Sequence, residues 1–218
     1  MRFILNIIDD TLDRITMYRL TLYVLTGLLL IGVIEGAFGV LRYAPSAILL
    51  SAALALATCW GVNELIAGVL RAAKSTDSVY ITALIIALIL PPASLGDIGG
   101  ALTIIAASIL AMAAKYVFAF RKKHFLNPAA FGVFAAGLLL GGYANWWAGG
   151  SLAMLPFVVI GGLAIVRKIR SFDAVLSVIF FALATSVLTT PALGMLTALK
   201  LALIHTPIIF FASVMLTE

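Results

Sequence analysis

Long apolar stretches separated by short polar connections fill nearly the whole chain. A helix needs roughly 20 apolar residues to cross about 30 Å of hydrocarbon. On this criterion the pattern predicts eight membrane segments, over residues 19–41, 46–70, 79–90, 99–120, 128–142, 152–166, 172–188 and 192–216. Residues 1–18 carry three aspartates and lack a continuous apolar core, which predicts an amphipathic cytoplasmic helix. The expected fold is therefore an all-α polytopic membrane bundle over residues 19–218.

Some of these segments are short or interrupted. The segment 79–90 stops at Pro91-Pro92, 128–142 is short, and the last segment is broken at His205-Thr206-Pro207. Non-helical backbone at membrane depth occurs where it is buried in protein or lines a wet cavity, so both breaks are predicted to border a site. One break early and one late also suggest inverted repeats, although prolines kink many membrane helices without a function.

The pair Asn127-Pro128 predicts a helix start. Asparagine is a favourable N-cap, and proline loses no hydrogen bond at the first helical position. The basic run 121–123 just before it should stay in water or among lipid headgroups, which places the helix start at a membrane interface. Asp77 is predicted to cap the segment that ends at Pro91. Helix starts of this kind favour an anion or a polarisable ring.

The composition excludes an ordinary soluble domain, because 64% of the residues are hydrophobic, 11% are charged and the mean hydropathy is +1.20. The net charge of +5 does not indicate a nucleic-acid partner, since the basic residues lie in short loops between apolar segments. Eight crossings place Arg2, Arg14, Arg19, Arg71, Lys74, Arg121, Lys122, Lys123, Arg167, Lys168 and Arg170 on one side and Arg42 on the other. Both termini are therefore predicted to be cytoplasmic. The single cysteine, Cys59, excludes an intrachain disulfide.

Two lysines and two histidines lie within or beside the apolar segments. Lys200 is expected roughly 10 Å inside its segment, at about 1.5 Å per residue, where a charge is costly unless it faces a cavity or partner. Lys115 can extend toward the basic run. His124 and His205 are the candidate axial ligands of a haem b, but their expected depths differ, which argues against haem. No cluster of Cys, His and carboxylates has metal-site spacing.

Two further patterns concern packing. The segment 143–147 is predicted to form an aromatic belt at the interface opposite the basic run. Glycine-rich faces, at Gly132, Gly137 and Gly141 and at Gly161-Gly162, allow close helix contact. The neighbour can be the same chain or a second copy, so the sequence leaves a homo-oligomer open.

Three stretches together resemble a known family. They run from Asp77-Ser78 to Leu90-Pro91-Pro92, from Lys123-His124-Phe125-Leu126-Asn127-Pro128 to Ala129, and from Phe210 to Thr217-Glu218. They look like the RnfD/NqrB family, the flavin-carrying membrane proteins of the Rnf electron-transport complex and of the sodium-pumping NADH:quinone reductase. More closely still, the chain resembles the membrane half of a bacterial branch in which the bundle precedes a soluble reductase domain.

The resemblance implies a urea-transporter-like bundle of inverted repeats in a bacterial inner membrane. It implies a flavin cofactor, FMN or riboflavin, and a cytoplasmic reductase domain or subunit that binds FAD and NAD(P). Family members join FMN to the threonine of a Ser-Gly-Ala-Thr motif, and this sequence has no such motif. The flavin is therefore expected to bind non-covalently.

Our leading hypothesis is a membrane component of an oxidoreductase that passes electrons from the reductase to an acceptor in or across the membrane. The candidate cofactor-binding residues are Asp77, Ser78, Tyr80, Pro91, Lys115, His124, Phe125, Asn127, Pro128, Lys200, His205 and Thr217. The alternatives are a transporter or channel for a small solute or a flavin, which would use the same broken helices, and a cofactor-free membrane anchor for a reductase. Apart from membrane lipid and the reductase, the sequence indicates no partner.

Overall fold

The computed structural model describes residues 12–71, 76–120, 123–124, 126–141, 144–189 and 194–215. The helices are α2 (Met17–Ala37), α3 (Pro45–Leu70), α4 (Thr76–Ile89), α5 (Ile98–Val117), α6 (Pro128–Leu140), α7 (Leu155–Ile169), α8 (Phe172–Thr189), α9 (Met195–His205), α10 (Ile208–Phe210) and the π-helix η2 (Phe211–Met215). Each of the predicted segments contains a helix, so the all-α prediction is confirmed. The predicted N-terminal helix, 1–18, lies mostly outside the described residues.

Four of these helices are long and apolar enough to cross a membrane: α2, α3, α5 and α8. A fifth span is possible if Met195–Ile204 and Ile208–Met215, which are bent by 57° at the predicted proline break, count as one. Helices α4 and α6 are apolar but shorter. The chain therefore has the helices of a multi-pass membrane protein, and eight crossings remain a prediction.

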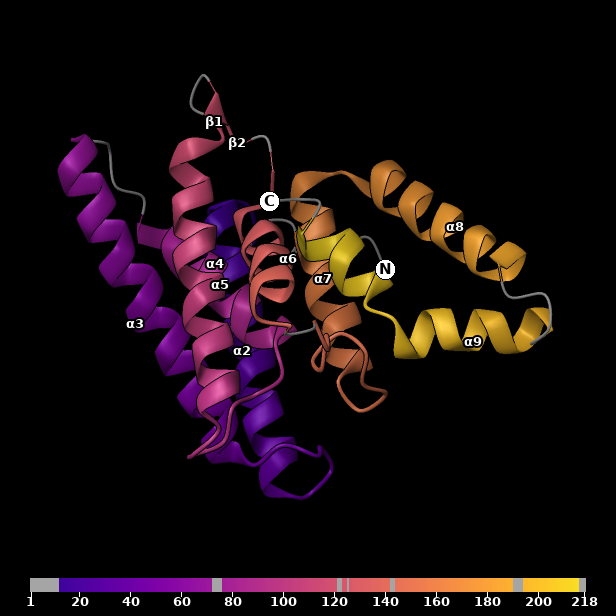
Figure 1. The fold of residues 1–218 in the computed structure, drawn as a ribbon. Helices are drawn as coiled ribbons and strands as arrows, with labels where there is room; N and C mark the ends of the chain where they lie inside the picture. The colour runs from indigo at the N-terminus through magenta and orange to yellow at the C-terminus, as the bar shows by residue number, and fades with distance from the viewer. Residues whose placement is uncertain are drawn as a thin grey trace. The chain divides into compact units, whose positions relative to one another are not determined.

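The sequence did not predict the short hairpin between α5 and α6. Strands β1 (Ala119–Phe120) and β2 (Lys123–His124) pair antiparallel, with Ala119 opposite His124 and Phe120 opposite Lys123. Helix α5 ends at Val117, a few residues before the predicted end of its segment. The hairpin reverses the chain, so α5 and α6 run antiparallel beside each other (Figure 1).

The chain divides into two compact units, and the boundary falls within α2. The central unit comprises residues 25–147, and the terminal unit comprises residues 1–24 and 148–218. In the central unit, α4 packs against α3, α5 and α6. Every residue from Ile81 to Ile89 is buried, which explains why the sequence of α4 is continuously apolar and not amphipathic.

Glycine allows the closest helix contact in the central unit. A Cβ atom on Gly132 of α6 would lie 2.3 Å from the carbonyl oxygen of Ala107 and 2.7 Å from the Cβ of Ala111, both on α5. Any larger side chain would therefore push the two helices apart. At Gly132 the neighbour of the predicted glycine face is therefore the same chain, whereas a Cβ on Gly141 would meet nothing within 4 Å.

The break after α4 is confirmed, and neighbouring segments bind its backbone groups. The carbonyl oxygen of Ile89 accepts hydrogen bonds from the backbone N–H groups of Asn145 (3.0 Å) and Trp146 (2.8 Å). The backbone N–H of Ala93 donates to Oγ of Ser51 on α3 at 2.8 Å. These bonds satisfy polar groups that would be costly to leave unpaired in an apolar surrounding.

The predicted aromatic belt is wrong at Trp147, which is 5% exposed. Its indole Nε1–H donates to the carbonyl oxygen of Ala87 at 2.9 Å, and its ring lies against Gly32 of α2. Tyr43 meets it edge-on, with ring centroids 6.1 Å apart. Trp147 thus packs inside the central unit and covers the end of α4, and Tyr143 lies outside the described residues.

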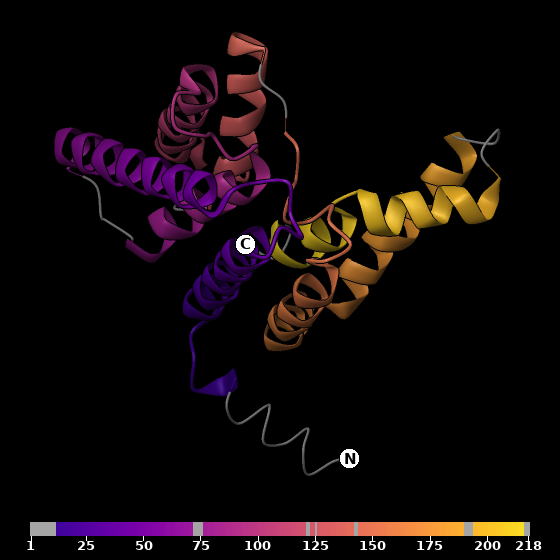
Figure 2. The same ribbon diagram turned by 90° about the horizontal axis from the view of Figure 1, so that it is seen from below.

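The terminal unit contains α7, α8, α9, α10 and η2. Helices α8 and α9 lie side by side in both ribbon views (Figures 1 and 2). Gly161 of α7 lies against Val24, and Gly162 lies so close to Ser213 of η2 that a Cβ there would be 2.4 Å from its Oγ. This second glycine face also serves contacts within the chain.

Candidate functional site

Helices α3, α4, α5 and α6 of the central unit have their termini at two ends of the unit. At the hairpin end, α3 and α5 finish, α4 and α6 begin, and strands β1 and β2 connect α5 to α6 (Figure 1). At the opposite proline end, α4 stops at Ile89 and the chain continues without helix through Pro91 and Pro92. Most of the predicted site residues of this unit fall at the hairpin end, and Pro91 falls at the other.

Buried polar side chains join α3 to α5 toward the hairpin end. The Tyr116 hydroxyl donates to Oδ1 of Asn63 at 2.8 Å, and Asn63 is only 3% exposed. Two turns earlier on α5, the carbonyl oxygen of Ser108 accepts a weak hydrogen bond from the Cys59 thiol, with a donor–acceptor distance of 4.0 Å. Both contacts lie in the interface between two apolar helices, where polar groups are held only when they are hydrogen-bonded.

Lys115 is the buried cation of this interface. It is 8% exposed, it precedes Tyr116 on α5, and its charge lies within electrostatic range of Cys59 on α3. It also stands in the last turn of α5, where a cation is favourable beside the helix carbonyl groups. The sequence favoured Lys200 as the costly buried lysine, whereas the structure buries Lys115.

The predicted start of α6 is confirmed. Asn127 is the N-cap, with its Oδ1 accepting from the backbone N–H of Ala130 at 3.1 Å, and Pro128 is the first helical residue and is buried. Phe131, one turn further on, meets Phe118 edge-on with ring centroids 5.1 Å apart. The sequence thus located this helix start correctly, down to its cap.

The start of α4 differs slightly from the prediction. Helix α4 begins at Thr76, so Asp77 lies within the first turn and not before it, although a carboxylate there still complements the helix dipole. Asp77, Ser78 and Tyr80 are not fully buried. The carbonyl oxygen of Ser78 accepts from the hydroxyl of the buried Thr82 at 2.8 Å.

The break at Pro91 borders a cavity of about 310 Å³. Its lining includes Leu90, Pro91, Asp97, Thr103 and Gly141, which come from the ends of α4 and α6 and the start of α5. Asp97 caps α5, with its Oδ1 accepting from the backbone N–H of Gly100 at 2.9 Å. Non-helical backbone therefore lines a cavity here, and the prediction that this break borders a site stays open.

The remaining candidate residues take no part in the contacts described above. Lys200 is exposed on α9 in the terminal unit, and His205 is the last residue of that helix, with a side chain outside the described set. His124 lies in β2, and its side chain is likewise outside the described set. Phe125 and Thr217 lie outside the described residues altogether.

Sequence reasoning gave no role to Ser51, Tyr116 or Trp147 in the interior. Serine, tyrosine and tryptophan are common in apolar helices, so only the partner across the interface shows what each does. Asn63 carried a usable signal, because an amide inside an apolar segment requires a hydrogen-bond partner. Among the described residues no group of three His, Cys, Asp or Glu side chains could hold a metal ion.

Comparisons with known proteins identify no relative: no family model, no curated protein and no solved structure matches the chain.

Proposed function

We propose that this chain is a membrane electron-transfer protein that binds a flavin non-covalently at the hairpin end of the central unit. Electrons pass from a cytoplasmic reductase that carries FAD and NAD(P) to an acceptor in or across the membrane. The observation that supports the proposal is the burial of Lys115 in the same α3–α5 interface that holds the hydrogen-bonded pair Asn63 and Tyr116. The family resemblance of the sequence points to the same cofactor.

The burial of Lys115 is costly, because moving a charge out of water into an apolar bundle costs several kcal/mol. A fixed cation at the edge of a flavin ring favours the form that carries negative charge after reduction, and the flavin supplies the electron-transfer chemistry when it is bound. Asn63 and Tyr116 are an amide and a phenol, which can donate to and accept from the polar edge of such a ring. These groups are of the chemical kind that would bind such a ring.

The start of α6 would contribute to flavin binding mainly through its helix dipole. The Oδ1 atom of Asn127 accepts a hydrogen bond from the backbone N–H of Ala130, and its carbonyl oxygen accepts one from the backbone N–H of Phe131. Pro128 has no N–H group. Few amide donors of this helix start remain for a ligand. The first turn of α6 has no acidic residue, whereas that of α4 carries Asp77, so α6 is the better neighbour for a phosphate group.

One observation favours transport as a second function. The cavity of about 310 Å³ at the proline end is bordered by non-helical backbone and contains the polar side chains of Asp97 and Thr103. Broken helices of this kind form the binding sites of many transporters. In this alternative a small solute or a free flavin would bind at the proline end, and Lys115 would have no role in binding.

The absorption spectrum of the purified full-length chain separates these functions. After incubation with FMN or riboflavin and removal of unbound ligand, the proposal expects the two absorption bands of an oxidised flavin, which bleach on addition of dithionite. A protein that stays colourless would refute the proposal. Uptake of radiolabelled flavin by vesicles containing the colourless protein would then support transport, no uptake would favour a cofactor-free anchor, and a Soret band would restore His124 and His205 as haem ligands.

A further inference from the structure

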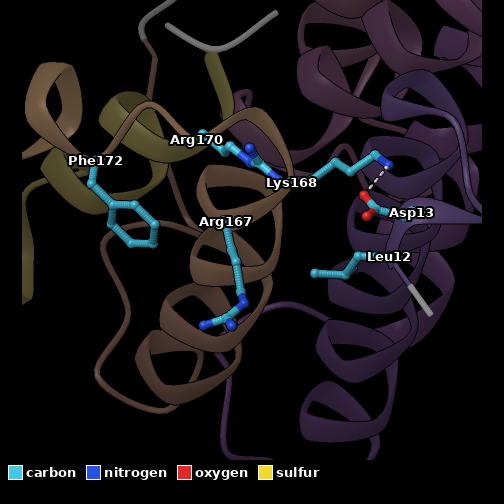
Figure 3. Close-up of a pocket in the computed structure, with 6 residues that line it drawn as sticks. All are labelled: Leu12, Asp13, Arg167, Lys168, Arg170 and Phe172. Atoms are coloured by element: carbon cyan, nitrogen blue, oxygen red, sulfur yellow. Dashed lines mark hydrogen bonds and ion pairs between the residues drawn. The ribbon is translucent and has the colours of Figure 1, made fainter. Parts of the chain in front are cut away.

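A cavity of about 300 Å³ lies at the end of helix α7 in the terminal unit. It is lined by Leu12, Asp13, Arg167, Lys168, Arg170 and Phe172, so three cations and one carboxylate share it. Lys168 Nζ lies 3.2 Å from Oδ1 of Asp13, and this ion pair forms one wall (Figure 3). Among the described residues that line it, basic side chains outnumber acidic ones, which suits an anionic group.

The positive groups approach the cavity from different positions. Arg170 follows the last turn of α7 in a left-handed conformation, with φ of 58°, and lies beside Lys168 in the close-up view. Arg167 extends along α7, away from the ion pair between Lys168 and Asp13 (Figure 3). The Lys168 side chain is 17% exposed and the Asp13 side chain is 70% exposed, so the ammonium group is the more buried partner of this ion pair.

An apolar cleft of about 190 Å³ adjoins this cavity. Val159 and Leu163 of α7, Leu176 and Ile179 of α8, and Ile209 of α10 are among the residues that line it. Phe172 lines both spaces and therefore forms their shared wall. One ligand with a charged end and a long apolar part could fill both.

We propose that the terminal unit binds one anionic phospholipid, with its phosphate in the cationic cavity and an acyl chain in the apolar cleft. Guanidinium groups bind phosphate oxygens through paired hydrogen bonds, and basic pockets between membrane helices are suited to anionic headgroups. The basic residues at the end of α7 lie where the charge asymmetry of the loops predicts the cytoplasmic leaflet, which supplies such lipids. This proposal is independent of flavin binding.

The adjoining cleft distinguishes a lipid from free phosphate. Inorganic phosphate would use the three cations but would gain nothing from Leu176, Ile179 or Ile209. A phospholipid can place an acyl chain against these apolar side chains, which inorganic phosphate cannot do. The lipid is therefore the occupant that uses all of the groups brought together here.

Native mass spectrometry of the full-length chain in detergent tests the charged half of the site. Titration with phosphatidylglycerol should give one tightly bound lipid, and phosphatidylcholine should bind more weakly. Arg170→Gln should weaken phosphatidylglycerol binding by about fivefold, the contribution of one basic residue. The matched control is Arg71→Gln, because Arg71 also follows a helix in a left-handed conformation, with φ of 49°, but does not line the cavity.

A second pair of variants tests the apolar half. Leu176→Trp should fill the cleft and weaken phosphatidylglycerol binding severalfold, whereas Leu188→Trp should not, because Leu188 is likewise an exposed leucine of α8 but does not line the cleft. Excess inorganic phosphate should leave the bound lipid in place. Three results would each overturn the proposal. They are equal effects of Arg170→Gln and Arg71→Gln, equal effects of the two tryptophan variants, and displacement of the lipid by phosphate.

Discussion

The two proline breaks look alike in the sequence but differ in their surroundings. Helix α4, which ends before Pro91, is buried at every position from Ile81 to Ile89, and its last carbonyl groups bind segments distant in the chain. In helix α9, which ends before Pro207, the buried described side chains are Ala198 and Ala202. Among the described residues, the side-chain hydrogen bond at this second break is local, from the Thr206 hydroxyl to the carbonyl oxygen of Ala202, although Pro207 itself lies against Gly149.

This difference shows that an apolar segment with a proline does not specify whether other segments will surround it. Both segments have too little polarity to show a preferred face, so whether neighbours surround them depends on residues far away, such as Ser51 and Trp147 for α4. A break held by distant partners is expected to be rigid, and a break held by a local bond is expected to yield to substitution. The inverted-repeat relation between the two stays a prediction.

The largest expected effect is the loss of the indole that covers the end of α4. Trp147→Ala removes a buried ring and leaves the carbonyl oxygen of Ala87 without its 2.9 Å hydrogen bond, which should lower the free energy of unfolding by about 3–5 kcal/mol. Trp60→Ala is the control, because Trp60 is 54% exposed on α3 and should change stability far less. Thermal unfolding in detergent measures both, and equal losses would contradict the assigned role of Trp147.

A smaller effect compares one hydroxyl at each break. Ser51→Ala leaves the buried N–H of Ala93 without its acceptor and should cost about 1–3 kcal/mol. Thr206→Val removes only a bond to the preceding helical turn and should cost at most about 0.5 kcal/mol. Thermal unfolding again provides the measurement, and a Thr206→Val variant that is less stable than Ser51→Ala would reverse the comparison.

The smallest effect concerns the prolines themselves. Thr206 is extended, with φ of −112° and ψ of 150°, as the residue before a proline prefers to be. Pro207→Ala removes that restriction, so α9 should continue toward α10 and helicity should rise, with a stability change within about 1 kcal/mol. Replacing both Pro91 and Pro92 by Ala should add no helix, because Asn145 and Trp146 hold the carbonyl of Ile89. Circular dichroism of the two variants should therefore differ, and equal gains in helicity would show that both breaks depend only on proline.

Much of the fold follows from local sequence signals. The apolar runs located each helix, Asn127-Pro128 located the start of α6, and both proline breaks fell where the structure has them. These features depend on a few neighbouring residues, and the same rules of capping and proline geometry apply in any protein.

The candidate site was only partly predictable, because burial depends on the partner helix. Lys115 was expected to extend toward the basic run, and its 8% exposure follows from the packing of α3 against α5, which no local pattern contains. Tyr116 becomes informative only once it donates to Asn63. Tryptophan is a residue type that is typical of membrane interfaces, and for that reason the sequence placed Trp147 at the interface and not in the interior.

The central claim is that a flavin binds beside Lys115 and not beside Lys200. The most direct measurement is a flavin titration of the Lys115→Met and Lys200→Met variants, followed by the absorbance of the bound cofactor, with gel filtration and circular dichroism to show that both variants are folded. Each substitution removes one positive charge and keeps a long side chain. We predict that Lys115→Met loses at least about tenfold in flavin affinity, as expected when about 1.4 kcal/mol of binding energy is removed, and that Lys200→Met binds like the unmodified protein. Equal binding by both variants, or a loss confined to Lys200→Met, would contradict this claim.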